Sequence, residues 1–380
     1  MNINKANHSR NLSSGHPYVY ASYEVDLYHG YVAVIDPVQD TIIERIRVGG
    51  EPGPMCMDPS EKKLYVINTR DDSVSIIDLV SFKVLNTVHI GNPFVRFFPN
   101  SIFAAPTGNK IYVAREDPGI SIIDFLTNEV VKEVQLDGEV GHPFAFAGNE
   151  NSSFVYVACT NNKVLAISID DDSIHPYGDG MELTFDGSRN PLAVHPDAHT
   201  QVTFGPAGML TYFDNKSIGS SSTSSLLDNT VSGIYLDNNR LFCTMRENKN
   251  YLKVINNLAI NKNGIISYKS FADFPSYYGQ DKIRVSRTQN YIGVTVQPTV
   301  SPVGGVQIID LHEGYTHLIE LPYVGDLAFF NDTKAYVGEG TSILPIDVAT
   351  ATPLPPIVLG VATDRLKVNN IISGYSKQSL

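Results

Sequence analysis

A phrase of two short apolar segments recurs along this chain. An aromatic-Val pair is followed about a dozen residues later by an apolar run that ends in Asp. Three clear copies are Tyr65-Val66 to Asp78, Tyr112-Val113 to Asp124, and Tyr336-Val337 to Asp347. Repetition at about 40 to 50 residues is typical of a β-propeller, in which each unit folds into one small antiparallel sheet. The repeat therefore predicts the architecture before any single residue is assigned a role.

The apolar run that ends in Asp occurs once in each unit, so its last residue can be used to count the units. Its last residue falls at Asp36, Asp78, Asp124, Asp170 (or Ile169), Asp214, Asn256, Asp310 and Asp347. The sequence thus predicts an all-β protein, a single β-propeller of eight four-stranded blades, with seven blades as the alternative. No segment has a sustained apolar period of about 3.6 residues, so helices are expected to be rare. The Asp is expected to accept bonds from the amides of the following turn, which is a structural role.

The first and last units predict how the ring closes. The first unit offers strands at Tyr18–Glu24, Tyr31–Asp36 and Thr41–Val48, with no innermost strand before them. The last unit ends near Gly360 and leaves a spare apolar stretch, Leu366–Ile372. We expect this stretch to supply the missing strand, because a closed ring has no exposed inner sheet edge.

Composition restricts the partners and the compartment. The net charge of −12 argues against nucleic acid or an anionic membrane, because neutralising phosphates needs clustered Lys and Arg. No run approaches the roughly 18 apolar residues of a membrane helix, and residues 1–15 contain no apolar signal segment. A cytoplasmic location is therefore expected. Segment 1–15, rich in Asn and Ser, is expected to be disordered, and residues 16–380 to form one propeller domain.

The units resemble the YVTN family of β-propeller repeats. The resemblance is strongest over residues 50–140, where Gly50-Glu51-Pro52 precedes a Tyr-Val strand and the run Val74–Asp78. It is weakest between residues 181 and 275. WD40 repeats are the alternative, but the chain contains no tryptophan. The resemblance implies a propeller fold; because the family includes lactonases, lyases and surface proteins, it implies no single reaction.

Two sets of loops are expected to share the face around the mouth of the central channel. These are the loops that enter the innermost strands and the loops that join strands two and three. On the first set lie Glu51 and His142, each directly before a proline, and on the second lie Arg70, Arg115 and Glu116. The candidate substrate-binding residues of this face are Arg70, Arg96, Arg115, Arg246, Asn190, Tyr277, Tyr278 and His29, with Arg189 and Arg284 as further arginines.

These residue types favour an anionic ligand and acid–base chemistry. Arginines gathered at one mouth of an acidic protein suit a small carboxylate- or phosphate-bearing molecule. The alternative is that the arginines pair with neighbouring glutamates, as surface charges often do. Imidazole titrates near neutral pH, so His142 is the candidate acid–base catalyst, with Glu51 or Glu116 as its helper. A His before Pro can equally cap a turn.

The sequence therefore supports two functions. The first is a cofactor-independent enzyme for a small anionic substrate, either a lactonase-like hydrolase or a lyase or isomerase. The alternative is a non-catalytic propeller that binds a protein partner through its rim. No metal site is expected, because His195 and His199 lie outside any helical pattern and have no third ligand suitably spaced. Phosphate-loop, dinucleotide and nucleophile-elbow motifs are absent, and no cofactor is expected.

Overall fold

The computed structural model places most of the chain. It describes residues 18–91, 102–115, 117–177, 191–196, 200–204, 210–214, 221–224, 230–236, 240–245, 251–256, 259–260, 266–267, 270–275, 280–297, 304–360, 366–373 and 376–378. The segment 1–15, which was expected to be disordered, lies outside these ranges.

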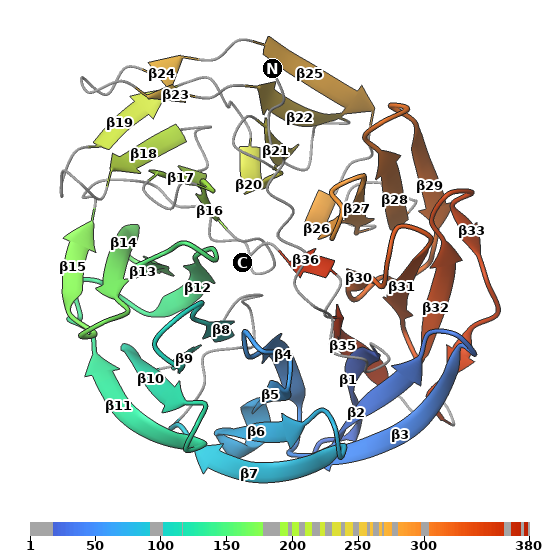
Figure 1. The fold of residues 1–380 in the computed structure, drawn as a ribbon, viewed down its shortest axis with the longest axis horizontal. Coiled ribbons are helices and arrows are strands. Elements are labelled where there is room, and N and C mark those ends of the chain that lie inside the picture. The colour runs from blue at the N-terminus through green and yellow to red at the C-terminus, as the bar shows by residue number, and fades with distance from the viewer. Residues whose placement is uncertain are drawn as a thin grey trace, which may run out of the picture.

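The described strands form eight sheets of four or five strands and one two-stranded hairpin, arranged as a β-propeller around a central axis (Figure 1). We number the sheets along the chain, innermost strand first. Sheet 1 comprises β35 (Lys367–Ser373), β1 (Val19–Asp26), β2 (His29–Asp36) and β3 (Thr41–Val48). Sheet 2 comprises β4 (Pro52–Met57), β5 (Lys63–Asn68), β6 (Ser73–Asp78) and β7 (Lys83–His89). Sheet 3 comprises β8 (Ile102–Ala104), β9 (Lys110–Ala114), β10 (Gly119–Asp124) and β11 (Glu129–Gln135). Sheet 4 comprises β12 (Pro143–Ala147), β13 (Phe154–Cys159), β14 (Lys163–Ser168) and β15 (Ile174–Tyr177).

The second half of the ring follows the same order. Sheet 5 comprises β16 (Leu192–Val194), β17 (Thr200–Phe204), β18 (Leu210–Asp214) and β19 (Ser221–Ser224). Sheet 6 comprises β20 (Thr230–Tyr235), β21 (Arg240–Met245), β22 (Tyr251–Asn256) and β25 (Ser270–Pro275), beside the hairpin of β23 (Ala259–Ile260) and β24 (Ile266–Ser267). Sheet 7 comprises β36 (Ser376–Gln378), β26 (Gln280–Ser286), β27 (Tyr291–Val296), β28 (Gly305–Asp310) and β29 (Thr316–Glu320). Sheet 8 comprises β30 (Leu327–Phe329), β31 (Lys334–Glu339), β32 (Ser342–Asp347), β33 (Thr352–Pro353) and β34 (Ile357–Val358).

The eight Asp or Asn positions that mark the units fall at or just beyond the end of the strand that precedes the outermost part of each sheet, and each lies in a different sheet. The described part of the chain contains a single helical element, the 3-10 turn η1 (Thr69–Asp71), so the expectation of few helices is confirmed. The predicted capping role of the Asp is confirmed as well. Asp78 Oδ1 accepts bonds from the Ser81 amide and hydroxyl at 2.6 and 2.7 Å, which lowers the pKa of this carboxyl.

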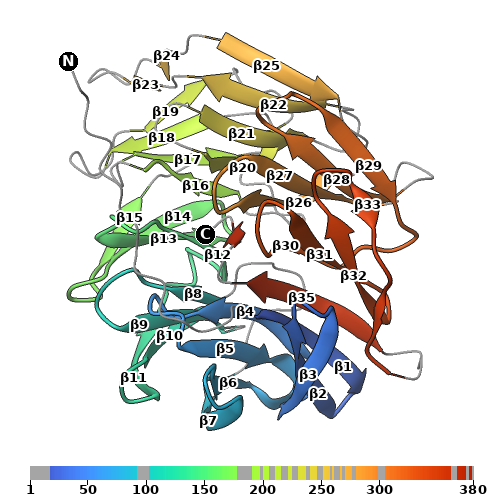
Figure 2. The ribbon, with the colours of Figure 1, turned by 45° about the vertical axis from the view of Figure 1, so that its right-hand side comes forward.

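The ring closes as the sequence predicts. The C-terminal strand β35 pairs antiparallel with β1, with Val19 opposite Ser373 and Tyr23 opposite Val368. Figure 2 shows β35 next to β1, with β4 of the following sheet on its other side. Two chain ends that are far apart in sequence therefore complete one sheet.

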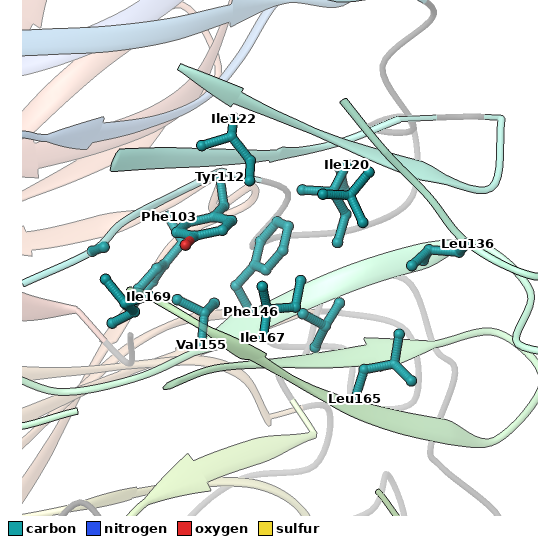
Figure 3. Close-up of a cluster of buried hydrophobic side chains, with 14 of the residues drawn as sticks. Phe103, Tyr112, Ile120, Ile122, Leu136, Phe146, Val155, Leu165, Ile167 and Ile169 are labelled. Atoms are coloured by element: carbon teal, nitrogen blue, oxygen red, sulfur yellow. The ribbon is translucent and has the colours of Figure 1, made fainter. Parts of the chain in front are cut away.

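The hydrophobic core lies between the facing surfaces of neighbouring sheets. Between sheets 3 and 4, Tyr112 and Ile122 pack with Phe146, Val155 and Ile167 (Figure 3). All five are at most 1% exposed. Strand residues alternate between the two faces of a sheet, so each sheet contributes one set of side chains to each neighbouring core. Burying a side chain of this size stabilises the fold by about 1.5–3 kcal/mol.

A polar contact between adjacent sheets explains the Tyr of the recurring phrase. The Lys334 ammonium lies 2.9 Å from Asp40 Oδ2, and the Tyr336 hydroxyl donates to Asp40 Oδ1. Asp40 sits in the turn between the third and fourth strands of sheet 1, with a left-handed φ of 53° that Asp and Asn tolerate. Burial and the bond to Asp40 raise the pKa of the Tyr336 phenol. The strand-two Tyr and the Lys two residues before it thus bind the turn of the next sheet.

The same contact recurs in full between sheets 3 and 4 and in part between sheets 2 and 3, where the acceptor is an Asn. Lys110 and Tyr112 of sheet 3 bind Asp172 at 2.7 and 3.3 Å. In sheet 2, Lys63 lies 2.7 Å from Asn128 Oδ1, but the buried Tyr65 hydroxyl has no hydrogen-bond partner among the described residues. The acceptor in the two complete contacts is a charged carboxylate, whereas Asn128 offers Lys63 a neutral amide oxygen.

We expect Asn128→Asp to stabilise the protein by about 1 kcal/mol, because a carboxylate is the acceptor that Tyr112 and Tyr336 bind and because it places a charge beside Lys63. Chemical denaturation followed by circular dichroism measures this change. Asp40→Asn is the matched reverse substitution and should destabilise by a similar amount. An Asn128→Asp variant no more stable than the parent would contradict this explanation.

A buried polar network joins the innermost parts of sheets 7, 8, 1 and 2. At its centre is Asp326, which is fully buried. Asp326 Oδ1 accepts a bond from Arg284 Nη2 at 2.9 Å, and Asp326 Oδ2 accepts one from the side-chain Nδ2 of Asn370. Lys282 Nζ lies 3.9 Å from the same Oδ2. Asn370 Oδ1 in turn accepts a bond from the Met55 amide at 3.2 Å. The sheets that meet where the ring closes are therefore tied by side-chain bonds as well as by β35.

Candidate functional site

The innermost strands begin on one face of the ring, and the loops between strands two and three lie on that same face. Backbone bonds connect the two sets of loops. The Thr69 amide donates to the Glu51 carbonyl at 3.1 Å, and the Thr160 amide donates to the His142 carbonyl at 2.9 Å. We call this face the mouth, and it is where the sequence places the candidate residues.

Three glycines bring sheets 1 and 2 unusually close together at the mouth. A Cβ on Gly30 would lie 2.0 Å from the Gly49 carbonyl oxygen, and one on Gly50 would lie 2.5 Å from the Leu27 carbonyl oxygen. Neither position has room for any other residue. The next residue, Glu51, has a left-handed φ of 48°, which is strained for a side chain of its size. The backbone is thus arranged to place the β1–β2 turn directly against the entry loop of sheet 2.

This approach sets Arg70 against Tyr28. The Arg70 guanidinium lies 5.1 Å from the centre of the Tyr28 ring, and its Nη2 donates to the Tyr28 hydroxyl at 3.3 Å. Tyr28 is 62% exposed, and Arg70 is exposed too. The Tyr28 hydroxyl, with smaller contributions from the Glu51 and Asp71 carboxylates, raises the pKa of Arg70. The result is a positioned, solvent-accessible guanidinium.

A His–Asp pair lies in the same turn. His29 Nδ1 is 2.7 Å from Asp26 Oδ2. Bonds from the Tyr28 amide and from His29 lower the pKa of the Asp26 carboxyl, so it is ionised at neutral pH. A carboxylate bound to Nδ1 leaves Nε2 as the imidazole nitrogen that can exchange a proton with a ligand. Asp26, Tyr28, His29, Glu51 and Arg70 make up the sheet 1–2 corner of the mouth, which is the candidate site.

The other described arginines of the predicted set are held by carboxylates. Arg115 is 4% exposed and lies 2.6 Å from both Asp117 and Glu133. Arg284 is 6% exposed and is paired with Asp326. Charge pairing, the alternative that the sequence left open, accounts for both. Arg70 differs, because none of the described carboxylates lies within 4.0 Å of its guanidinium.

His142 lies at the mouth but apart from this corner. It directly precedes β12 in sheet 4, whereas Glu51 precedes β4 in sheet 2, so sheet 3 separates the two. The His142 amide donates to the Thr160 hydroxyl at 2.9 Å, and its carbonyl accepts from the Thr160 amide. Its backbone thus joins the entry loop to the strand two–three loop, as expected of a turn-capping residue.

Several candidate residues lie outside the described part of the chain. These are Glu116, Arg96, Arg189, Arg246, Asn190, Tyr277 and Tyr278, together with His199 of the His195–His199 pair. Of the candidates that are described, the structure brings together His29, Glu51 and Arg70. Asp26 and Tyr28 were not among the site residues predicted from the sequence. The feature that could have indicated them is the turn Asp26-Leu27-Tyr28-His29, in which a carboxylate and an aromatic residue lie on either side of an apolar one.

The described residues contain no group of three or more His, Cys, Asp and Glu side chains arranged to hold a metal ion. None of their helical segments has the length and apolar character needed to span a bilayer.

Comparison with solved structures supports the β-propeller fold. The dihydro-heme d1 dehydrogenase NirN, in complex with DHE, superposes with a TM-score of 0.68 at 14% identity, over 96% of this chain and 75% of that one. Apo AztD from Citrobacter koseri gives 0.59 at 13%, over 96% and 100%. The C-terminal WD40 domain of Sif2 gives 0.59 at 12%, over 85% and 90%.

These likenesses establish the class of protein and nothing finer. The chain is a β-propeller whose structural neighbours range from a dehydrogenase to a WD40 domain, so the fold leaves the function open. No protein-family model and no curated protein matches the sequence. The resemblance to YVTN repeats therefore stays a prediction.

Proposed function

We propose that this protein binds a small carboxylate- or phosphate-bearing molecule at the sheet 1–2 corner and acts on it by cofactor-independent acid–base chemistry. Arg70 holds the anion, and His29, oriented by Asp26, transfers the proton. In the hydrolysis of a lactone His29 would take a proton from the attacking water and return it to the released ring oxygen; in a lyase or isomerase step it would remove a proton from the substrate carbon. The observation that carries the proposal is the contrast among the arginines: Arg115 and Arg284 are buried against carboxylates, whereas Arg70 is exposed against Tyr28, in the turn that also holds the His29–Asp26 pair.

The corner has the parts that such chemistry needs. A planar guanidinium held over an aromatic ring loses little conformational freedom when it binds an anion, which favours affinity. An imidazole with a fixed orientation is an effective proton donor or acceptor near neutral pH. His29 is a better candidate than His142, the catalyst that the sequence favoured, because the Asp26 carboxylate binds His29 Nδ1, whereas sheet 3 separates His142 from Glu51.

We expect Arg70→Ala to weaken anion binding by about 10- to 100-fold, because a charge-assisted hydrogen bond contributes about 1.5–3 kcal/mol. Thermal-shift and calorimetric titrations with inorganic phosphate, citrate and a panel of small lactones measure binding and turnover. Arg47→Ala, an exposed arginine on the outer strand β3, is the matched control and should bind as the parent does. His29→Asn should keep binding but lower turnover by about 100-fold or more. Equal anion affinity in the Arg70 and Arg47 variants would exclude this site.

One observation favours a second function, a scaffold that binds a protein partner. An exposed Tyr with an Arg stacked on it is typical of the residues that dominate protein interfaces. Tyr28→Ala separates the two functions. It should cost a protein partner about 2 kcal/mol or more, and it should lower small-anion affinity far less than Arg70→Ala does.

A further inference from the structure

The channel-facing edge of β26 carries a strand from the far end of the chain. Residues Ser376–Gln378 form β36, which pairs antiparallel with β26 as the innermost member of sheet 7. Its register sets Ser376 opposite Ser286 and Gln378 opposite Arg284. Figure 1 shows β36 near the centre of the ring, inside β26. It is thus a fifth strand within the propeller channel.

The position of β36 along β26 is specific. β26 begins at the mouth with Gln280 and ends on the opposite face with Ser286. β36 pairs with the last three residues of β26, so it occupies the half of the channel that lies away from the candidate site.

The two C-terminal strands differ strongly in how they are held. β35 pairs with β1 at six positions and contributes Val368, Ile371 and Ile372 to buried clusters. At its end the Ser373 hydroxyl donates to the Phe329 carbonyl, which fixes the base of the tail. Among the described residues β36 pairs at three positions. A strand that pairs over so short a length of sheet edge can exchange with another extended segment.

We propose that the channel-facing edge of β26 is a binding site for an extended peptide strand, and that the C-terminal strand Ser376–Gln378 is its occupant within the same chain. The segment is a removable strand: its short tether gives it a high effective concentration, while its few backbone bonds allow it to leave. This proposal is independent of the function proposed for the mouth.

Hydrogen exchange of the intact protein tests it. In a chain that ends at Ser373, the channel-directed amides of Arg284–Ser286 should exchange at least tenfold faster than in the full chain. Amides of the outer strand β29 should be unchanged. Adding the synthetic peptide Gly-Tyr-Ser-Lys-Gln-Ser-Leu should restore their protection in the shortened chain in a saturable way. It should have little effect on the full chain, where the site is filled. The same peptide with Pro in place of Lys should not bind, because Pro cannot donate to a strand ladder.

Each outcome supports or overturns the proposal. Equal exchange of Arg284–Ser286 in the two chains would show that β36 does not protect this edge. Faster exchange that the peptide fails to reverse would show that the edge does not accept a strand in trans. If the shortened chain does not fold, Lys377→Pro in the full chain provides the same comparison. It should release the same amides and make the full chain able to bind the unmodified peptide, and failure on both counts would overturn the proposal.

Discussion

Asp326→Ala is expected to destabilise the protein by about 3–5 kcal/mol. Asp326 is fully buried, and its two oxygens hold Arg284 of sheet 7 and Asn370 of sheet 1. Without it the Arg284 guanidinium, which is 6% exposed, has lost the carboxylate that compensates its charge. Removing one partner of a buried ion pair costs about this much because the other charge stays out of water. Urea denaturation measures the loss.

Arg115 provides the matched control for this substitution. It is as deeply buried as Arg284, but it contacts two carboxylates, those of Asp117 and Glu133. Asp117→Ala leaves one of them in place, so it should cost about 1 kcal/mol or less. Adding Arg284→Met to Asp326→Ala should recover part of the stability by removing the stranded charge. If Asp326→Ala cost no more than Asp117→Ala, the network would not hold the ring together.

A chain that ends at Thr363 is expected to lose cooperative folding near physiological temperature. The deletion removes β35, which opens the inner edge of β1 and takes Leu366, Val368, Ile371 and Ile372 out of the core. At about 1.5–3 kcal/mol for each buried side chain, the loss is comparable to the whole stability of a typical domain, about 5–15 kcal/mol. Thermal unfolding followed by circular dichroism is the measurement.

The chain that ends at Ser373 is the control for this deletion. It keeps β35 and its pairing with β1, and it should therefore melt cooperatively close to the full-length temperature. A chain ending at Thr363 that melts at the same temperature as the full chain would mean that β35 does not close the ring. The two deletions together separate the closing strand from the strand in the channel.

Much of the strand pattern was predictable from local signals. The expected strand Thr41–Val48 matches β3 residue for residue, and the expected strand Tyr31–Asp36 lies within β2 and ends at the same residue. The closing strand was displaced by one residue, at Lys367–Ser373 instead of Leu366–Ile372. Alternating apolar residues and turn-forming Gly, Pro, Asn and Asp specify a short antiparallel strand within a few residues of chain. No distant contact is needed to recognise it.

The charged residues were harder to assign because their partners are distant in sequence. Arg284 and Asp326 are 42 residues apart, and Asp326 and Asn370 are 44 apart. A loop position predicts that an arginine is near the mouth, but the direction of its side chain depends on which carboxylate the neighbouring strands present. For this reason Arg115, placed in the mouth by the sequence, pairs with Glu133 on the outer strand β11.

The sequence by itself therefore determined the repeat, the strands within each unit, the capping role of the third-strand Asp and the closing strand. These depend on local periodicity and on turn chemistry, which a chain carries with it. Only the tertiary structure decided which of the described mouth arginines has no carboxylate within 4.0 Å, that Tyr28 and Asp26 complete the corner with Arg70 and His29, and that a strand lies inside the channel. Those features arise where sheets 1 and 2 approach at Gly30 and Gly50, and where the last residues reach sheet 7. Such contacts join segments far apart in the chain, so packing around the ring decides them.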